Sequence, residues 1–198
     1  MEHIAHLKKD KKLAVLVAEP YSELRFKKNV PVALMASIMS QQLSTKVADV
    51  IFKRFLALYE GKEPSLQDIL DTPFDKLRAI GLSNAKTNYV HNVAKFFIEE
   101  KISNKKLQAM SNDEIIKLLT KIKGVGQWTV EMLLMFTLGR EDIIALDDLG
   151  IQQAMIKLYK LDKLDKKLLR EKMKKISLKW SPYRTHACLY LWRWKDTK

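Results

Sequence analysis

Residues 118–138 read LLTKIKGVGQWTVEMLLMFTL, and this stretch decides what kind of fold the rest of the chain completes. It opens with a helical pattern that ends near Ile122, and a second helical pattern begins near Gln127. Gly124 and Gly126 lie between them, and glycine adopts backbone conformations that other residues avoid. The stretch therefore predicts two antiparallel helices joined by a very tight turn.

This glycine turn is suited to hold a phosphate group. Small residues let an anion approach the backbone, and the N–H groups that start the second helix point toward it. Lys121 and Lys123 add positive charge beside the turn. Such a site grips a nucleic-acid backbone without reading bases, although an ordinary helical hairpin with a packing glycine has the same pattern. The residues that we expect to contact phosphate are Lys123, Gly124, Val125, Gly126, Gln127 and Thr129.

The charge of the whole chain agrees with an anionic partner. Among 198 residues, 36 are Lys or Arg and 23 are Asp or Glu, which gives a formal net charge of +13. A surplus of this size favours nucleic acid as the partner, and a lysine-rich proteome or a contribution of the charge to solubility are the alternative explanations. The hydrophobic fraction of 47% excludes a mere basic tail.

Several classes of protein are disfavoured by the composition. The single Cys188 excludes an internal disulfide and a thiolate zinc site, and the four histidines show no metal-ligand spacing. No apolar run reaches the roughly 18 residues of a membrane span, and the first residues lack the apolar core of a secretory signal. We expect a soluble intracellular protein, cytoplasmic and nucleoid-associated in a bacterium or nuclear in a eukaryote.

Helical periodicity continues on both sides of the glycine turn. The chain has only 6 Gly and 5 Pro, so few positions interrupt a helix. Ser111 with Glu114, and Ser65 with Asp68, have the spacing of capping boxes. We expect an all-α protein of about ten short helices, arranged as one unit with two lobes.

Two adjacent acids follow the second helix of the hairpin, in the sequence IIALDDLG at 143–150. Either Asp147 or Asp148 could cap the helix predicted at 149–159, because a side-chain oxygen there accepts from free backbone N–H groups. A carboxylate with a chemical role is the other interpretation.

Four segments, in this order, resemble the helix-hairpin-helix DNA glycosylase superfamily, over about residues 32–194. Asp148 follows Trp128 by twenty residues, and this spacing is similar to the alkylation-repair branch, typified by DNA-3-methyladenine glycosylase II. The segments are SIMSQQLSTKVADVIFKRF (37–55), KGVGQWT (123–129), LDDLGIQQ (146–153) and KWSPYRTHACLYLWRW (179–194).

The resemblance implies a single domain over residues 1–198 with an active site in the cleft between two α-helical lobes. One lobe would span about residues 30–147, and the other about 1–29 together with 148–198. The implied function is that of a monomeric, monofunctional DNA glycosylase. It would flip alkylated bases (3-methyladenine and 7-methylguanine) out of duplex DNA and remove them hydrolytically in base excision repair.

Three alternatives remain beside this function. The same fold could act on another lesion, such as hypoxanthine, uracil or 8-oxoguanine. A non-catalytic module that binds damaged DNA would lack an acid at position 148, where this chain has Asp148. A ribosomal or other RNA-binding protein would explain the charge, but not the ordered set of glycine turn, Trp128 and Asp148.

The resemblance also implies roles for single residues. Asp148 would be the catalytic carboxylate, because cleavage of an N-glycosidic bond develops positive charge on the sugar. Asp147 would be a cap or a support. Trp128 occupies the position of the lysine nucleophile of bifunctional members, and an indole forms no Schiff base, so no strand cleavage is expected.

The base pocket would contain Trp128, Met132 and Trp192, whose indole rings attract a cationic alkylated purine. Relatives often have an aromatic residue where this chain has Met132, and plain core packing is the alternative for each. Gln42 aligns with the residue that wedges into the DNA stack where a base has left, against the alternative of a solvated glutamine. Arg184, beside the terminal helix, would contact phosphate or pair with an acid.

No cofactor is expected to be required. The single cysteine excludes the iron–sulfur cluster that some members of the superfamily carry in its usual form. The hairpin of this family can bind Na⁺ or K⁺ through backbone carbonyls, and by position these would belong to Thr120, Ile122 and Val125.

Overall fold

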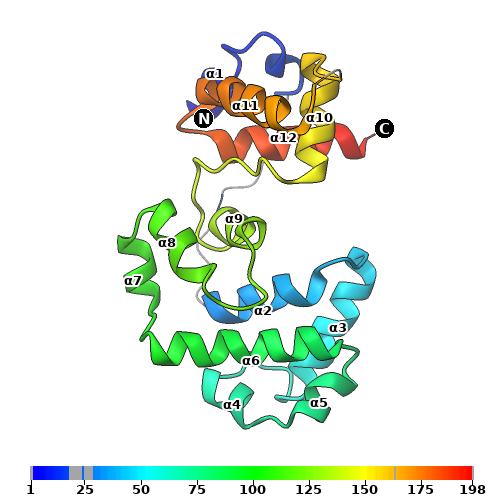
Figure 1. Cartoon of the computed structure of the whole chain (residues 1–198), viewed down its shortest axis with the longest axis vertical. Helices are drawn as coiled ribbons and strands as arrows, with labels where there is room; N and C mark the ends of the chain where they lie inside the picture. The colour runs from blue at the N-terminus through cyan, green and yellow to red at the C-terminus, as the bar shows by residue number, and fades with distance from the viewer. Residues whose placement is uncertain (1, 18–23, 25–28, 163, 198) are drawn as a thin grey trace. The chain divides into compact units, whose positions relative to one another are not determined.

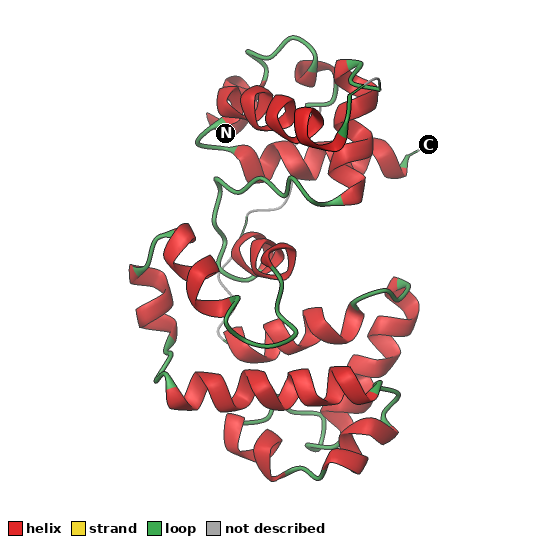
Figure 2. Cartoon of the chain, viewed as in Figure 1, coloured by secondary structure: helices red, strands yellow, loops and turns green. Residues whose placement is uncertain are grey.

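The computed structural model describes residues 2–17, 24, 29–162 and 164–197, and this part of the chain contains helices and no strand (Figure 2). The all-α fold class is confirmed. The number of about ten helices was too low, because several helices are only six residues long and escape a search for periodicity. Within the described residues, no helix is both long and apolar enough to span a bilayer.

The chain divides into two compact units. Unit 2 is continuous, from Phe26 to Leu138, and unit 1 combines Met1–Arg25 with Gly139–Lys198. The division after residue 138 precedes the predicted one near 147, because the segment between them bonds to the C-terminal part of the chain. For example, the N–H of Thr185 donates to the carbonyl of Glu141 at 2.8 Å. The other predicted boundary, near 29, adjoins residues 25–28, which lie outside the described residues.

Unit 2 is a helical bundle arranged around its longest helix, α6 (Figure 1). Helices α2, α4 and α5 pack against α6, while α8 and α9 form the hairpin pair. Its core includes the fully buried side chains of Leu34, Phe55, Val90 and Leu134. The helices are α2 (Val30–Ser40), α3 (Thr45–Ala57), α4 (Leu66–Asp71), α5 (Phe74–Ala79), α6 (Asn84–Glu99), α7 (Asn104–Ala109), α8 (Asn112–Leu119) and α9 (Gln127–Phe136).

Side-chain caps explain where several of these helices begin. Both predicted capping boxes are present, at Ser65 with Asp68 and at Ser111 with Glu114. Ser83 caps α6 by accepting from the backbone N–H of Lys86. Each cap satisfies a donor that the first turn of a helix leaves without an intrahelical partner.

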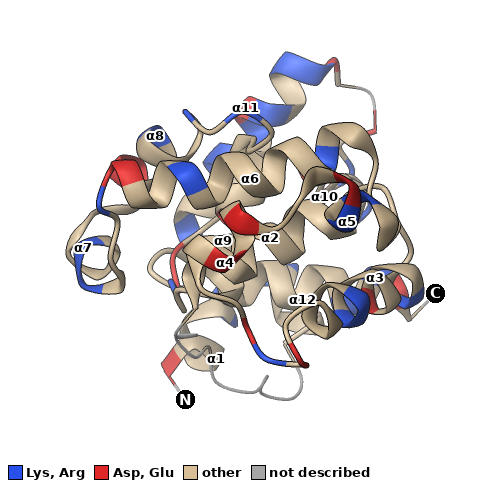
Figure 3. Ribbon diagram, turned by 90° about the horizontal axis from the view of Figure 1, so that it is seen from below, with Lys and Arg blue, Asp and Glu red and all other residues tan. Residues whose placement is uncertain are grey.

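In unit 1, a part-buried polar contact joins the N-terminal segment to the C-terminal segment. The carboxylate of Asp10 accepts from the Tyr159 hydroxyl at 2.8 Å and from the Trp180 indole N–H at 3.1 Å. Its elements are α1 (Glu2–Leu7), η1 (Leu13–Val15), α10 (Leu149–Tyr159), α11 (Lys166–Ser177), η2 (Leu178–Trp180) and α12 (Arg184–Asp196). Helix α11 is rich in Lys and Arg, which Figure 3 shows along it, and it buries Met173 and Ser177.

Candidate active site

The glycine turn of unit 2 joins α8 to α9, as predicted. Helix α8 ends at Leu119, a little earlier than expected, and α9 begins at Gln127. Gly124 has a φ of +101°, and a Cβ built on it would lie 2.1 Å from Cγ of Tyr89 on α6. Only glycine fits there, because any side chain would both strain the backbone and collide with the ring. Tyr89 is thus a support of the turn that sequence reasoning missed.

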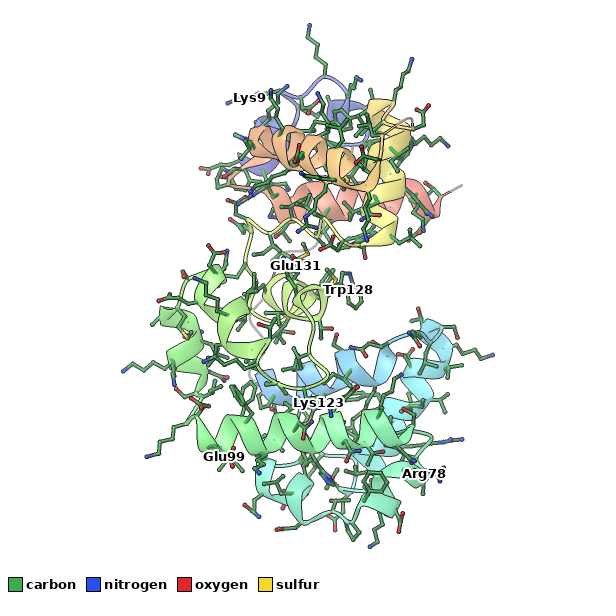
Figure 4. All side chains as sticks on the ribbon, viewed as in Figure 1. Lys9, Arg78, Glu99, Lys123, Trp128 and Glu131 are labelled. Carbon is green, nitrogen blue, oxygen red and sulfur yellow. The ribbon has the colours of Figure 1, made fainter. Side chains whose placement is uncertain are left out.

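The start of α9 is open to an anion. Gly126 is the N-cap residue and has no side chain with which to bond the first-turn N–H groups. Lys121 and Lys123 are exposed beside it, and Figure 4 shows Lys123 on the turn near α6. A helix N-terminus attracts negative charge through its dipole and the N–H groups of its first turn.

Two of the six predicted phosphate contacts face inward. The N–H of Val125 donates to the carbonyl of Ile122 at 3.0 Å, so this donor is already used. The Thr129 side chain is buried and accepts from Nε2 of Gln41 at 3.2 Å. A phosphate would therefore meet the exposed part of the turn, which includes Lys123, Gly126 and Gln127.

The predicted carbonyl ligands for Na⁺ or K⁺ lie in the same turn. The Ile122 carbonyl accepts the N–H of Val125, and α8 ends at its C-cap Thr120. Among the described residues, no group of three or more His, Cys, Asp or Glu could hold a metal ion. The cation site of backbone carbonyls stays a prediction.

Helix α9 also carries two of the predicted pocket residues. Trp128 is 37% exposed and projects outward from α9 (Figure 4). Met132, one turn later, lines a hollow of about 590 Å³ that is walled by α2, α3 and α9. The hollow is lined by Asn29, Val32, Ala33, Ala36, Ser37, Phe52, Glu63, Met132, Leu133, Phe136 and Thr137.

The predicted wedge residue stands at the end of α2. Gln42 is exposed and has a φ of +59°, a left-handed conformation that costs a non-glycine residue energy. The side chain of the preceding Gln41, as described above, is tied to α9. The turn between α2 and α3 therefore exposes Gln42 to solvent, while the residue before it is fixed to α9.

In unit 1, the structure brings Asp148 and Trp192 together. Oδ1 of Asp148 accepts from the indole N–H of Trp192 at 2.8 Å and from the backbone N–H of Ile151 at 2.8 Å. Gly150 makes this approach possible, since a Cβ there would lie 3.0 Å from the Trp192 ring and 3.1 Å from Oδ1 of Asp148. Sequence reasoning did not single out Gly150, although it stands within the quoted motif LDDLGIQQ.

Asp148 is also the helix cap that its position predicted as an alternative. Helix α10 runs from Leu149 to Tyr159, as expected, with Asp148 as its N-cap. Asp147 is not the cap, which corrects that part of the expectation, because its carboxylate forms an ion pair with Arg170 on α11. This ion pair agrees with the expectation that Asp147 is a cap or a support, in its second part.

Arg184 pairs with an acid. Its Nε donates to Oδ1 of Asp142 at 2.6 Å and its Nη2 to Oδ2 at 2.9 Å. Burial acts to raise the pKa of Asp142, but the hydrogen bonds from Arg184 and Ser181 outweigh it and hold that pKa below its usual range. This bidentate pair holds the start of α12, the helix that carries Trp192.

The chemistry available at Asp148 follows from its two fixed bonds. A carboxylate held in one orientation can stabilise a positive charge that develops on a nearby sugar, without reorganising during the reaction. It can also orient a water molecule for attack. An indole beside the same oxygen adds an aromatic face suited to a cationic ring.

Known proteins are similar to this chain in both sequence and fold. Residues 35–178 match the family model of the HhH-GPD superfamily base excision DNA repair proteins. DNA-3-methyladenine glycosylase 1 of Schizosaccharomyces pombe is 38% identical over 177 residues, which cover 88% of this chain and 72% of that protein. The DNA-3-methyladenine glycosylase of Saccharomyces cerevisiae is 32% identical over 198 residues, covering 84% of this chain and 67% of the relative.

Solved structures agree with these relatives. The S. pombe 3-methyladenine DNA glycosylase Mag1, in complex with abasic DNA, superimposes with a TM-score of 0.85 and 34% identity, over 98% of this chain and 96% of the other. A DNA-3-methyladenine glycosidase from Bacillus halodurans gives a TM-score of 0.83 and 33% identity, over 97% and 88% of the two chains.

Proposed function

The chain belongs to the HhH-GPD superfamily of base excision DNA repair proteins, and from this membership we propose that it is a monofunctional DNA glycosylase for alkylated bases. It binds duplex DNA that contains a damaged base, extrudes that base and hydrolyses its N-glycosidic bond. The leading substrates are 3-methyladenine and 7-methylguanine. The relatives named for 3-methyladenine, at up to 38% identity, support this choice of lesion.

The observation that carries the proposal is the fixed carboxylate of Asp148. Its Oδ1 is bonded to Trp192 and to the first turn of α10. In the proposed reaction, this carboxylate stabilises the positive charge of the sugar as the base departs, and it orients the attacking water. Because an alkylated purine already carries positive charge and leaves easily, the assistance needed is modest.

The other site residues have matching roles in this proposal. The exposed turn with Lys123 and Gly126 grips the DNA backbone, Gln42 fills the gap in the base stack, and Trp128 contributes an aromatic face. Trp128 has no amine, so the reaction ends at an abasic site without a covalent intermediate. Borohydride should accordingly trap no protein–DNA adduct.

Cofactors and location complete the proposal. The protein works without a dissociable cofactor, and Na⁺ or K⁺ at the carbonyls of Thr120, Ile122 and Val125 would serve only to bridge a phosphate to the hairpin. It acts as a monomer on chromosomal DNA, in the nucleoid of a bacterium or the nucleus of a eukaryote.

The test is base release from methylated duplex DNA, measured by mass for the wild type and for Asp148→Asn. Asparagine caps a helix as well as aspartate does, so α10 and the melting temperature should be unchanged. Loss of the charge should slow release about 10²–10³-fold while DNA binding persists. Asp147→Asn, which removes only the ion pair with Arg170, is the matched control and should retain activity.

Two results would contradict the proposal. Release by Asp148→Asn at the wild-type rate would remove Asp148 from the mechanism. A wild-type protein that binds methylated DNA but releases neither 3-methyladenine nor 7-methylguanine would remove the alkylated-base function itself.

A further inference from the structure

One lysine of unit 2 differs from the solvated lysines of the chain. Lys86, in the first turn of α6, is half-buried, and its Nζ donates to the carbonyl of Met39 at 2.8 Å and to the carbonyl of Gln41 at 2.7 Å. Burial lowers the pKa of the Lys86 ammonium. The fold thus keeps a charged group where desolvation opposes the charge, and two carbonyl acceptors offset that cost.

The two carbonyls belong to the C-terminal end of α2. The last carbonyls of a helix have no intrahelical donor and carry the negative end of its dipole, so a cation there is favourable. Neighbouring donors bond other carbonyls at this end: the hydroxyl of Ser40 donates to the carbonyl of Ser37, and the N–H of Leu43 donates to the carbonyl of Ser40. The carbonyls of Met39 and Gln41 instead accept from a side chain of another helix, Lys86 of α6.

Gln42 is the next residue after Gln41, whose main chain and side chain are both bonded to other helices. The carbonyl of Gln41 accepts from Lys86 on α6, and the side-chain amide of Gln41 donates to Thr129 on α9. The next residue turns into the left-handed region, with a φ of +59° for Gln42. Such a conformation persists only where its surroundings hold it, and here α6 and α9 both hold the residue before it.

The same face of α6 supports the phosphate-binding turn. Tyr89, three residues after Lys86, packs against Gly124. Asn92, three residues further, donates its side-chain N–H to the carbonyl of Lys123 at 3.3 Å. Residues at this spacing lie in one row on a helix, so a single row of α6 contacts both DNA-facing elements of unit 2.

We propose that Lys86 is a positioning residue for base extrusion, which holds the end of α2 so that Gln42 enters the DNA stack in register with the phosphate grip. The proposal rests on the proposed function, since it takes Gln42 as the wedge. In this role Lys86 acts through the end of α2, because two of the three N–H donors of its ammonium bond the carbonyls of Met39 and Gln41.

The first experiment compares Lys86→Met, which keeps the chain length without the ammonium, with Lys86→Arg, which keeps the charge. Lys95→Met, on the exposed face of the same helix, is the matched control. Single-turnover release of 7-methylguanine should fall about tenfold in Lys86→Met, recover partly in Lys86→Arg and stay unchanged in Lys95→Met.

A positioning role predicts a pattern that a loss of fold does not. A mispaired base costs less to extrude, so the defect of Lys86→Met should shrink when 7-methylguanine lies opposite thymine in place of cytosine. The defects of Lys86→Met and Gln42→Ala should also fail to add, since both remove the same insertion. Equal defects on both duplexes, or fully additive defects, would overturn the proposal.

A readout without catalysis separates this proposal from the proposed function. The probe is duplex DNA with a tetrahydrofuran abasic site and 2-aminopurine beside it, whose fluorescence rises when the wedge disturbs stacking. The wild type at saturation should raise the fluorescence, and Lys86→Met should reduce that rise at least twofold. An equal rise in both, or no rise in the wild type, would overturn the role of Lys86 whether or not the wild type releases a methylated base.

Discussion

Helices α9 and α10 begin in opposite ways. The N-terminus of α9 starts at Gly126, which has no side chain, next to exposed Lys123. The N-terminus of α10 is occupied by the carboxylate of Asp148, whose Oδ1 the indole of Trp192 also holds. Each helix end carries the same partial positive charge from its aligned peptide dipoles. One end is thus left for an outside anion, and the other holds an anion of the protein.

In the proposed function, this one backbone feature serves two different tasks. At α9, the missing cap costs some helix stability and leaves donors for a DNA phosphate. At α10, the cap fixes a carboxylate in one orientation, which is what stabilisation of a positive transition state requires. The capping role and the proposed catalytic role of Asp148 therefore support each other.

Among the variants that test this comparison, the largest effect is expected from removing one of the hydrogen bonds that fix the Asp148 carboxylate at α10. Trp192→Phe keeps an aromatic ring and removes the N–H that donates to Asp148. A hydrogen bond to a charged group contributes about 1.5–3 kcal/mol, so base release should slow about 10–100-fold while DNA binding is kept. Trp194→Phe, in the same helix with Lys157 over its ring, is the control. Equal single-turnover rates for the two variants would show that Trp192 does not orient the carboxylate.

A smaller effect is expected from making α9 begin like α10. Gly126→Asp places a carboxylate at the N-cap, and a Cβ there meets nothing within 4 Å. The helix should gain a few tenths of a kcal/mol, but the new charge repels phosphate and should weaken DNA binding roughly tenfold at low salt. Gly126→Ser adds a cap without charge and separates the two effects. Titrations in which Gly126→Asp binds DNA as tightly as Gly126→Ser would mean that no phosphate meets this end.

The smallest effect is expected on the salt dependence of DNA binding at the start of α9. If Lys123 neutralises one phosphate, Lys123→Ala should make the slope of log affinity against log salt shallower by about 0.9. The control is Lys76→Ala on α5, a helix that packs on the opposite side of α6 from the hairpin (Figure 1). Identical slopes for wild type and Lys123→Ala would place the phosphate elsewhere.

Local features of the fold were predictable from the sequence. The bounds of α10, the start of α9 and the two capping boxes each depend on residues within a few positions of one another, so a short window contains their cause. Of the two acids, Asp148 rather than Asp147 forms the cap, and Asp147 instead pairs with Arg170 of a later helix, which a short window does not contain.

The features of the site that were not predicted from the sequence depend on contacts between distant positions. The need for Gly124 comes from Tyr89, the need for Gly150 from Trp192, and the hold on α2 from Lys86, each on another helix. A glycine or a lysine in a sequence carries no sign of the ring or carbonyl that it will meet. The proposed catalytic role of Asp148 comes from resemblance alone, because a capping aspartate and a catalytic one look the same in a sequence.

The contact of Asp10 with Tyr159 and Trp180 has a consequence for synthesis on the ribosome. Asp10 and Tyr159 are 149 positions apart, and all of unit 2 is translated between them. Unit 2 is continuous, so it can close its core while the chain is still growing, since domains generally fold as units during synthesis. Unit 1 must wait for α10 and η2 to emerge. The unit that carries the glycine turn is then complete before the unit that carries Asp148, so the nascent protein gains its proposed catalytic carboxylate last.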